Sequence, residues 1–187
     1  MFWWHLSYPI EVIRRAHLPN NKSGIYISIN VLLEMVCIII NMATAICACH
    51  YDGTNISAHP VFLNYCDNTS ACSWVSHKCK VSLIGRRLAR LFVGLVMGTS
   101  IGIQAEWLST HDNTIADDIS RIKSSTSDGT FDYSNLLITY PQLISCRVFQ
   151  PSPTLLGMIW EILLDKKSPD PLILRKIAPP ALGSFTS

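Results

Sequence analysis

The chain has few charged residues and no segment that resembles a secretory signal. Only 15% of its 187 residues are charged, 49% are hydrophobic, and the formal net charge is +2. This length and composition suit one domain with a hydrophobic core and an appended segment. The opening "MFWWHLSYPIEVIRR" lacks a basic region followed by an apolar run and a small-residue cleavage site. We therefore expect an intracellular protein, of the cytoplasm or the nucleus.

Paired cysteine motifs are also absent. The seven cysteines are an odd number, and no two of them form a CxxC pair. Cys47, Cys49 and His50 lie close together, but their spacing matches no zinc motif. Most of the cysteines fall within apolar runs, where a free thiol behaves as a small hydrophobic group. The pattern favours core thiols in a reducing compartment.

The longest apolar run, residues 27 to 50, leaves two interpretations open. It is long enough to span a bilayer, which takes ~20 apolar residues. However, it contains Asn30, Glu34 and Asn41, and an acid within a span costs about 2.5–3.5 kcal/mol on insertion scales. A buried helix with one functional acid accounts for the same residues, and it would involve no membrane. In that case the positions that pack against a sheet are Ile38, Ile39, Met42, Ala45 and Ile46.

Helices and strands alternate over the first two thirds of the chain, and no internal repeat is present. The periodicity predicts helices near residues 28–49, 68–78, 82–98 and 114–124, and strands near residues 61–66 and 101–108. Such alternation is typical of an α/β layered domain, here residues 1–124. Residues 125–187 are predicted to form a helical and Pro-rich extension, with short helices in "FDYSNLLITYPQL" and "PTLLGMIWEILL".

Three acids stand at the ends of predicted elements. Glu34 lies in the first turns of the long helix, Asp67 follows a strand, and Asp117 begins the last helix of the α/β part. Sites in α/β sheets gather beyond the carboxyl ends of strands, and carboxylates are the ligands that Mg²⁺ prefers. The alternative is that Asp67 caps a helix, Asp117 interacts with a helix dipole, and Glu34 is an isolated acid.

A basic segment separates two of these acids. No acidic residue occurs between Asp67 and Glu106. The basic residues that fall there are Lys78, Lys80, Arg86, Arg87 and Arg90. The three arginines share helical spacing, while neighbouring leucines can face the core. Basic residues near a group of acids suit a nucleic-acid backbone held beside bound metal, although a solvated helix face has the same pattern.

These motifs resemble those of a known family. "INVLLE", "YCDNTSACSW" and "AEWLSTHDNTIADDISR" are similar, in this order, to segments of the ribonuclease H domain of retroelement reverse transcriptase polyproteins, especially gypsy-like and DIRS-type elements. The family ending "N-x-x-A-D-x-L-S-R" is matched from Asn113 to Arg121, with Ile119 in place of Leu. The resemblance covers roughly residues 25 to 124.

The resemblance implies a fold and an activity. The fold would be a ribonuclease H-like mixed sheet flanked by helices, once part of a larger polyprotein. Glu34, Asp67 and Asp117 would bind Mg²⁺ and cleave RNA in an RNA–DNA hybrid. His111, in the loop before the last motif helix, would assist product release.

The departures from the family lower the expected activity. The family uses four acids, and the first stands on the opening strand, whereas residues 1–26 contain only Glu11. We therefore expect the first strand to be missing from the domain. Three hypotheses follow: a nucleic-acid-binding nuclease domain with weak or lost hydrolysis, a non-catalytic nucleic-acid-binding remnant, and a small protein with a single membrane span.

Overall fold

The computed structural model describes residues 2–16, 29–51, 60–76, 83–99, 101–121, 133–165 and 181–186. Over these ranges the chain is mixed α/β. The helices are α1 (Ile10–Ala16), α2 (Ile29–Tyr51), α3 (Thr69–Ser76), α4 (Leu83–Met97), α5 (Thr114–Ser120), α6 (Ser134–Thr139), the 3₁₀ helix η1 (Pro141–Ser145) and α7 (Pro153–Leu163). The strands are β1 (Phe2–Trp3), β2 (Val61–Cys66), β3 (Gly102–Trp107), β4 (Arg147–Pro151) and β5 (Gly183–Thr186).

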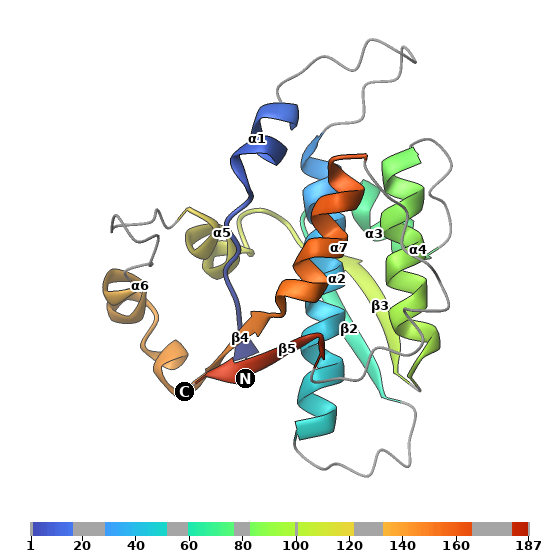
Figure 1. Ribbon diagram of the computed structural model, residues 1–187. Helices are drawn as coiled ribbons and strands as arrows, with labels where there is room; N and C mark the ends of the chain where they lie inside the picture. The colour runs from blue at the N-terminus through green and yellow to red at the C-terminus, as the bar shows by residue number, and fades with distance from the viewer. Residues whose placement is uncertain are drawn as a thin grey trace.

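The long apolar helix α2 lies at the centre of the molecule, with the other elements packed around it (Figure 1). It contacts α3, α4, β2, β4 and β5. Its predicted inward residues are all at most 6% exposed, which confirms the burial of Ile38, Ile39, Met42, Ala45 and Ile46. By length and composition alone, α2 is the one helix in the described ranges that could cross a membrane.

The strands form two separate sheets. β2 and β3 pair in parallel, from Val61 opposite Gly102 to Cys66 opposite Trp107. The second sheet has the order β1-β4-β5, in which β4 is parallel to β1 and antiparallel to β5. The mixed sheet therefore contains strands from residues 125–187, where only helices and Pro-rich segments were expected.

The N-terminus is joined to this C-terminal part through aromatic contacts. The rings of Phe2 and Phe185 are 4.6 Å apart, and those of Trp3 and Tyr133 meet edge to face at 4.8 Å. One hydrophobic core runs from Val12 to residues of α7 and to Leu182. The C-terminal extension thus packs on the same core as the α/β part, and β1 stands beside β4 instead of β2.

One of the two asparagines that argued against a membrane span, Asn41, lies in a chain of side-chain hydrogen bonds. The Trp4 indole N–H donates to Asn41 Oδ1 at 2.8 Å, and Asn41 Nδ2 donates to Asn64 Oδ1 at 2.5 Å. This chain of hydrogen bonds links the N-terminal segment, α2 and β2. Since Asn64 is buried, losing its partner would cost about 1–3 kcal/mol.

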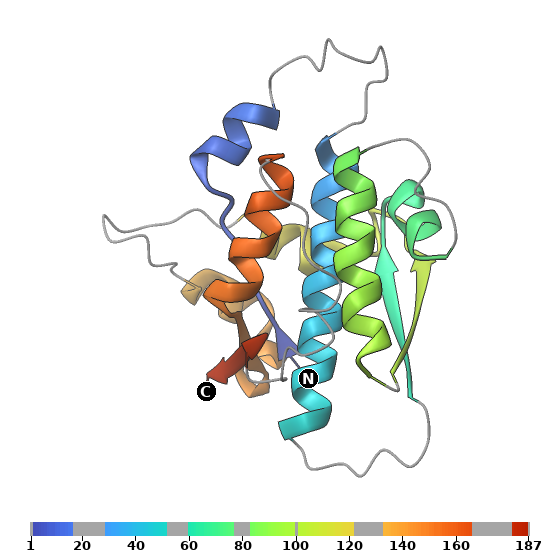
Figure 2. The ribbon, with the colours of Figure 1, turned by 45° about the vertical axis from the view of Figure 1, so that its right-hand side comes forward.

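Sequence patterns placed most local elements correctly. The predicted strand at 61–66 coincides with β2, and the predicted long helices correspond to α2 and α4. The side chain of Asn68 caps α3, because its Oδ1 accepts from the backbone N–H groups of Ser70 and Ala71. Figure 2 shows α4 running along α2, with the β2–β3 sheet at the edge of the molecule.

Burial of α2 predicts a large effect of truncating one of its core residues. Ile39 is 0% exposed and Ile138 on α6 is 78% exposed. Ile39→Ala should lower the free energy of unfolding by about 2–5 kcal/mol, because it leaves a cavity. Ile138→Ala, the matched control, should change it by less than about 0.5 kcal/mol. Urea unfolding in detergent-free buffer measures both, and equal effects would contradict the central position of α2.

Candidate functional site

Two of the three predicted acids meet at the carboxyl end of the β2–β3 sheet. Glu34 lies in the second turn of α2, and Asp67 follows the last residue of β2. The start of α2 and the carboxyl ends of both parallel strands lie at the same end of the molecule (Figure 1). Because side chains alternate along a strand, Tyr65 faces outward and Cys66 faces α2, where it is 4% exposed. Cys66 thereby joins the two acids.

The potential ligand atoms of Glu34, Cys66 and Asp67 all lie within 4.8 Å of one another. The Cys66 thiol donates to Glu34 Oε2 at 3.5 Å. The backbone N–H of Asn68 donates in turn to Cys66 Sγ at 3.4 Å. The two carboxylates are only partly buried and line a surface pocket with Leu33 and Asn68. The group can therefore be reached from solvent.

Burial and nearby negative charge favour the neutral forms of Glu34 and Cys66. Burial raises the pKa of the Glu34 carboxyl, and the nearby Asp67 charge raises it further, while the hydrogen bond from Cys66 opposes the shift. Burial also raises the pKa of the Cys66 thiol, and the Glu34 charge adds to that effect. Without a cation, Cys66 thus remains a thiol that donates to Glu34.

Asp67 does not act as the helix cap that was considered for it. The side chain that caps α3 is that of Asn68, which leaves the Asp67 carboxylate available to the group. The Asp67 backbone carbonyl accepts a hydrogen bond from the Trp107 indole at 3.2 Å. This contact ties the end of β2 to the end of β3.

Two further residues lie beside Glu34 and were not predicted from the sequence. Tyr8, on the extended N-terminal segment, shares a hydrogen bond with Cys37 of α2. Its ring also packs edge to face on Trp160 of α7, with centroids 5.5 Å apart. Burial and the neighbouring Glu34 charge raise the pKa of Cys37 to about 12. The three-residue spacing of Glu34 and Cys37 on one helix was the signal that could have placed Cys37 here.

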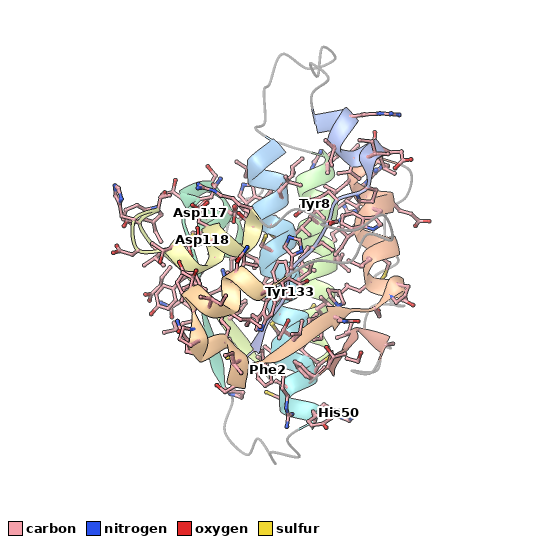
Figure 3. The ribbon with its side chains drawn as sticks, turned by 90° about the vertical axis from the view of Figure 1, so that its left-hand side faces the viewer. Phe2, Tyr8, His50, Asp117, Asp118 and Tyr133 are labelled. Carbon is pink, nitrogen blue, oxygen red and sulfur yellow. The ribbon has the colours of Figure 1, made fainter. Side chains whose placement is uncertain are left out.

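The third predicted acid is engaged elsewhere. Asp117 lies in the first turn of α5, and its Oδ2 forms an ion pair with Arg121 Nη2 at 2.6 Å. Its neighbour Asp118 accepts from the Tyr140 hydroxyl at 2.6 Å. Figure 3 shows both aspartates on α5, and Tyr8 on the N-terminal segment. Among the described residues, the group of ligand atoms within 4.8 Å does not include Asp117.

The remaining predicted site residues are spread over other parts of the fold. His111 is exposed in the loop before α5. Arg86 and Arg90 are exposed on α4, whereas Arg87 is half-buried and forms an ion pair with Asp165 after α7. Lys78 and Lys80 lie outside the described residues. Two of the five predicted basic residues are therefore exposed cations on α4.

Comparison with known proteins identifies no relative of this chain. No protein-family model, no curated protein and no solved structure matches the chain. Its function is therefore inferred from its own residues.

The raised pKa of Glu34 predicts a pH-dependent effect of Glu34→Gln in the presence of a chelator. A carboxyl with a raised pKa stabilises the folded state fully below its unfolded-state value of about 4.5, and this contribution is lost as the pH rises through the folded-state value. Gln does not titrate, so the variant should gain stability relative to the parent between about pH 4.5 and neutral pH. Urea unfolding over this range tests it; a difference that does not change with pH would contradict the burial of the Glu34 charge.

Proposed function

We propose that the chain is a retroelement-derived ribonuclease H-like domain that binds RNA–DNA hybrid and has weak or no hydrolytic activity. The observation that carries this proposal is the meeting of Glu34, from the first turns of a helix, with Asp67, at the carboxyl end of a parallel strand. Residues 35–66 separate the two acids in the sequence, and both were predicted from their places at the ends of elements as well as from the motifs of the resemblance.

The order of elements around these acids supports the same fold. α2 carries Glu34, β2 leads to Asp67, α3 and α4 connect to the parallel strand β3, and α5 carries Asp117. This matches the order of the three motifs that resemble the family. The family has a single mixed sheet, whereas β2 and β3 form a sheet of their own in the described residues. The single mixed sheet is therefore part of what we propose.

The described residues do not fit a pair of magnesium ions. Two-metal hydrolysis uses ions about 3.5–4 Å apart, held by several carboxylates. Here Glu34 and Asp67 are the two carboxylates that come together, and Asp117 lies outside their group. The third ligand atom is the Cys66 sulfur, which Mg²⁺ does not favour. We therefore assign no hydrolytic step to this site.

Nucleic-acid binding draws on a different part of the molecule. Arg86 and Arg90 are exposed one helical turn apart on α4, so both can contact phosphates. The first half of α4 lies at the same end of the molecule as the carboxyl ends of β2 and β3 (Figure 2). Arg87 contributes less in this proposal, because its charge is already paired with Asp165.

The burial of α2 favours this proposal over a single-span membrane protein. A spanning helix exposes its apolar side chains to lipid, whereas Met35, Ile39 and Met42 are 0% exposed among other protein groups. Asn41, which would be costly in a bilayer, has partners on both sides.

The basic residues of α4 predict a salt-dependent affinity for an RNA–DNA hybrid. Arg86→Ala and Arg90→Ala should each reduce the slope of log affinity against log salt by up to ~0.9. Arg87→Ala should change the slope less, since its guanidinium is paired with Asp165. Arg14→Ala, which removes an exposed cation on α1, is the charge-matched control. Fluorescence anisotropy over a salt series measures the slopes. Binding without salt dependence, or equal slopes for all four variants, would remove the assignment of α4.

The position of Asp117 predicts that it contributes nothing to any residual cleavage. The purified chain should cut a labelled RNA–DNA hybrid poorly in magnesium, and Asp117→Asn should leave both the cleavage rate and hybrid affinity within about twofold of the parent, the usual range for a surface substitution. Gel analysis of the labelled RNA measures cleavage. Robust cleavage that Asp117→Asn abolishes would show that Asp117 joins Glu34 and Asp67 during catalysis.

A further inference from the structure

We propose that Glu34, Cys66 and Asp67 form a binding site for a single Zn²⁺ ion. Their ligand atoms already lie within 4.8 Å of one another, and two of them come from adjacent residues at the end of β2. The donor set is one sulfur and two carboxylates, which suits a borderline-soft ion better than Mg²⁺. This site depends on the cluster itself and not on nucleic-acid binding.

The spacing of the group is close to that of a tetrahedral zinc site. Zinc bonds of about 2.3 Å to sulfur and about 2.0–2.2 Å to oxygen place a sulfur and an oxygen ligand roughly 3.6 Å apart at a tetrahedral angle. The observed distance between Cys66 Sγ and Glu34 Oε2 is 3.5 Å. This pair needs almost no movement. The ligand atom of Asp67 lies at most 4.8 Å from the other two, so it has to approach by no more than about 1.4 Å.

The charges of the group also favour a divalent cation. In the metal-free state, the thiol proton of Cys66 separates its sulfur from the Glu34 carboxylate. Zn²⁺ would replace this proton: the S–H bond breaks, the proton leaves to solvent, and a Zn–S bond forms with the thiolate. A thiolate and two carboxylates carry three negative charges, and a divalent cation held among them reduces their mutual repulsion.

One backbone N–H group beside Cys66 can donate to a metal-bound thiolate. The Asn68 N–H that donates to its sulfur is held in place because the Asn68 side chain caps α3. Cys72, on the same helix, packs beside Cys66 and donates its S–H to the Cys66 carbonyl at 3.7 Å. Three protein ligands leave a fourth position on the ion, and the pocket beside Glu34 and Asp67 opens that position to solvent.

Cobalt substitution tests this site directly. The full chain, reduced and stripped of metal, is titrated with Co²⁺, which takes the place of Zn²⁺ and reports a bound thiolate as a near-ultraviolet charge-transfer band. We expect the band to saturate at one Co²⁺ per chain, to disappear on addition of Zn²⁺, and to persist in excess Mg²⁺. Calorimetry with Zn²⁺ in buffers of different ionisation enthalpy should detect proton release from Cys66.

Matched variants separate this site from the other thiols. Cys66→Ser should abolish the band, whereas Cys146→Ser, at a thiol that hydrogen-bonds Gln142 in a distant part of the fold, should retain it. Asp67→Asn, at a partly exposed side chain, should weaken Co²⁺ binding at least tenfold, since losing even an outer partner costs about 10–100-fold in metal affinity. Circular dichroism establishes whether each variant is folded. If Cys66→Ser is not folded, the effect of Asp67→Asn on Co²⁺ binding tests the site.

Two outcomes would overturn the proposal. One is the absence of a charge-transfer band in the parent chain, and the other is a band that Asp67→Asn or Cys66→Ser leaves unchanged. Neither outcome affects the binding of RNA–DNA hybrid by α4 when that binding is measured in the presence of a chelator, so this proposal and the proposed function fail independently.

Discussion

The need to bury α2 determines the arrangement of the other elements. This helix of 23 residues is apolar on nearly every face, and its central residues are withdrawn from solvent. One small sheet cannot cover such a helix, because a sheet packs on a single side of it. The β2–β3 sheet therefore covers one side, and α4, β4 and β5 cover others. The C-terminal extension is part of the fold for this reason.

The candidate site forms where this coverage ends. Near the start of α2, Glu34 and Cys37 are only partly covered. Burial there is deep enough to favour the neutral carboxyl and thiol, yet the carboxylates still line an open pocket. A cation that neutralises the acids removes the electrostatic penalty of holding them together. The same partial burial thus explains the shifted pKa values and leaves the group open to the ion that we propose.

Local patterns in the sequence predicted the helices and strands whose bounds depend on neighbouring residues. They did not predict the strand pairings and side-chain contacts that join distant parts of the chain. The bounds of β2 follow from a short apolar run before Asp67, and the start of α3 follows from the capping side chain of Asn68. The pairing of β1 with β4 joins residues more than 140 positions apart, and it depends on aromatic contacts such as Phe2 with Phe185. No local period encodes such contacts. Cys66 was overlooked because a cysteine in an apolar strand has the same pattern whether or not an acid lies opposite it.

The position of Asp117 shows how the extension acts on the site. Its ion pair with Arg121 is largely exposed and contributes at most about 1 kcal/mol, so this pair alone would not keep the acid from a metal. The stronger constraint is the anchoring of α5 as a unit. Ile119 is buried in a second hydrophobic cluster with Trp3, Leu136 and Leu143. Asp118 is bonded to Tyr140 in the same region. Burying a side chain of the size of Ile119 contributes about 1.5–3 kcal/mol, which is more than the ion pair contributes. The extension thus anchors the helix that carries the third acid, and the cation proposed for the remaining residues is one that accepts a thiolate in place of that acid.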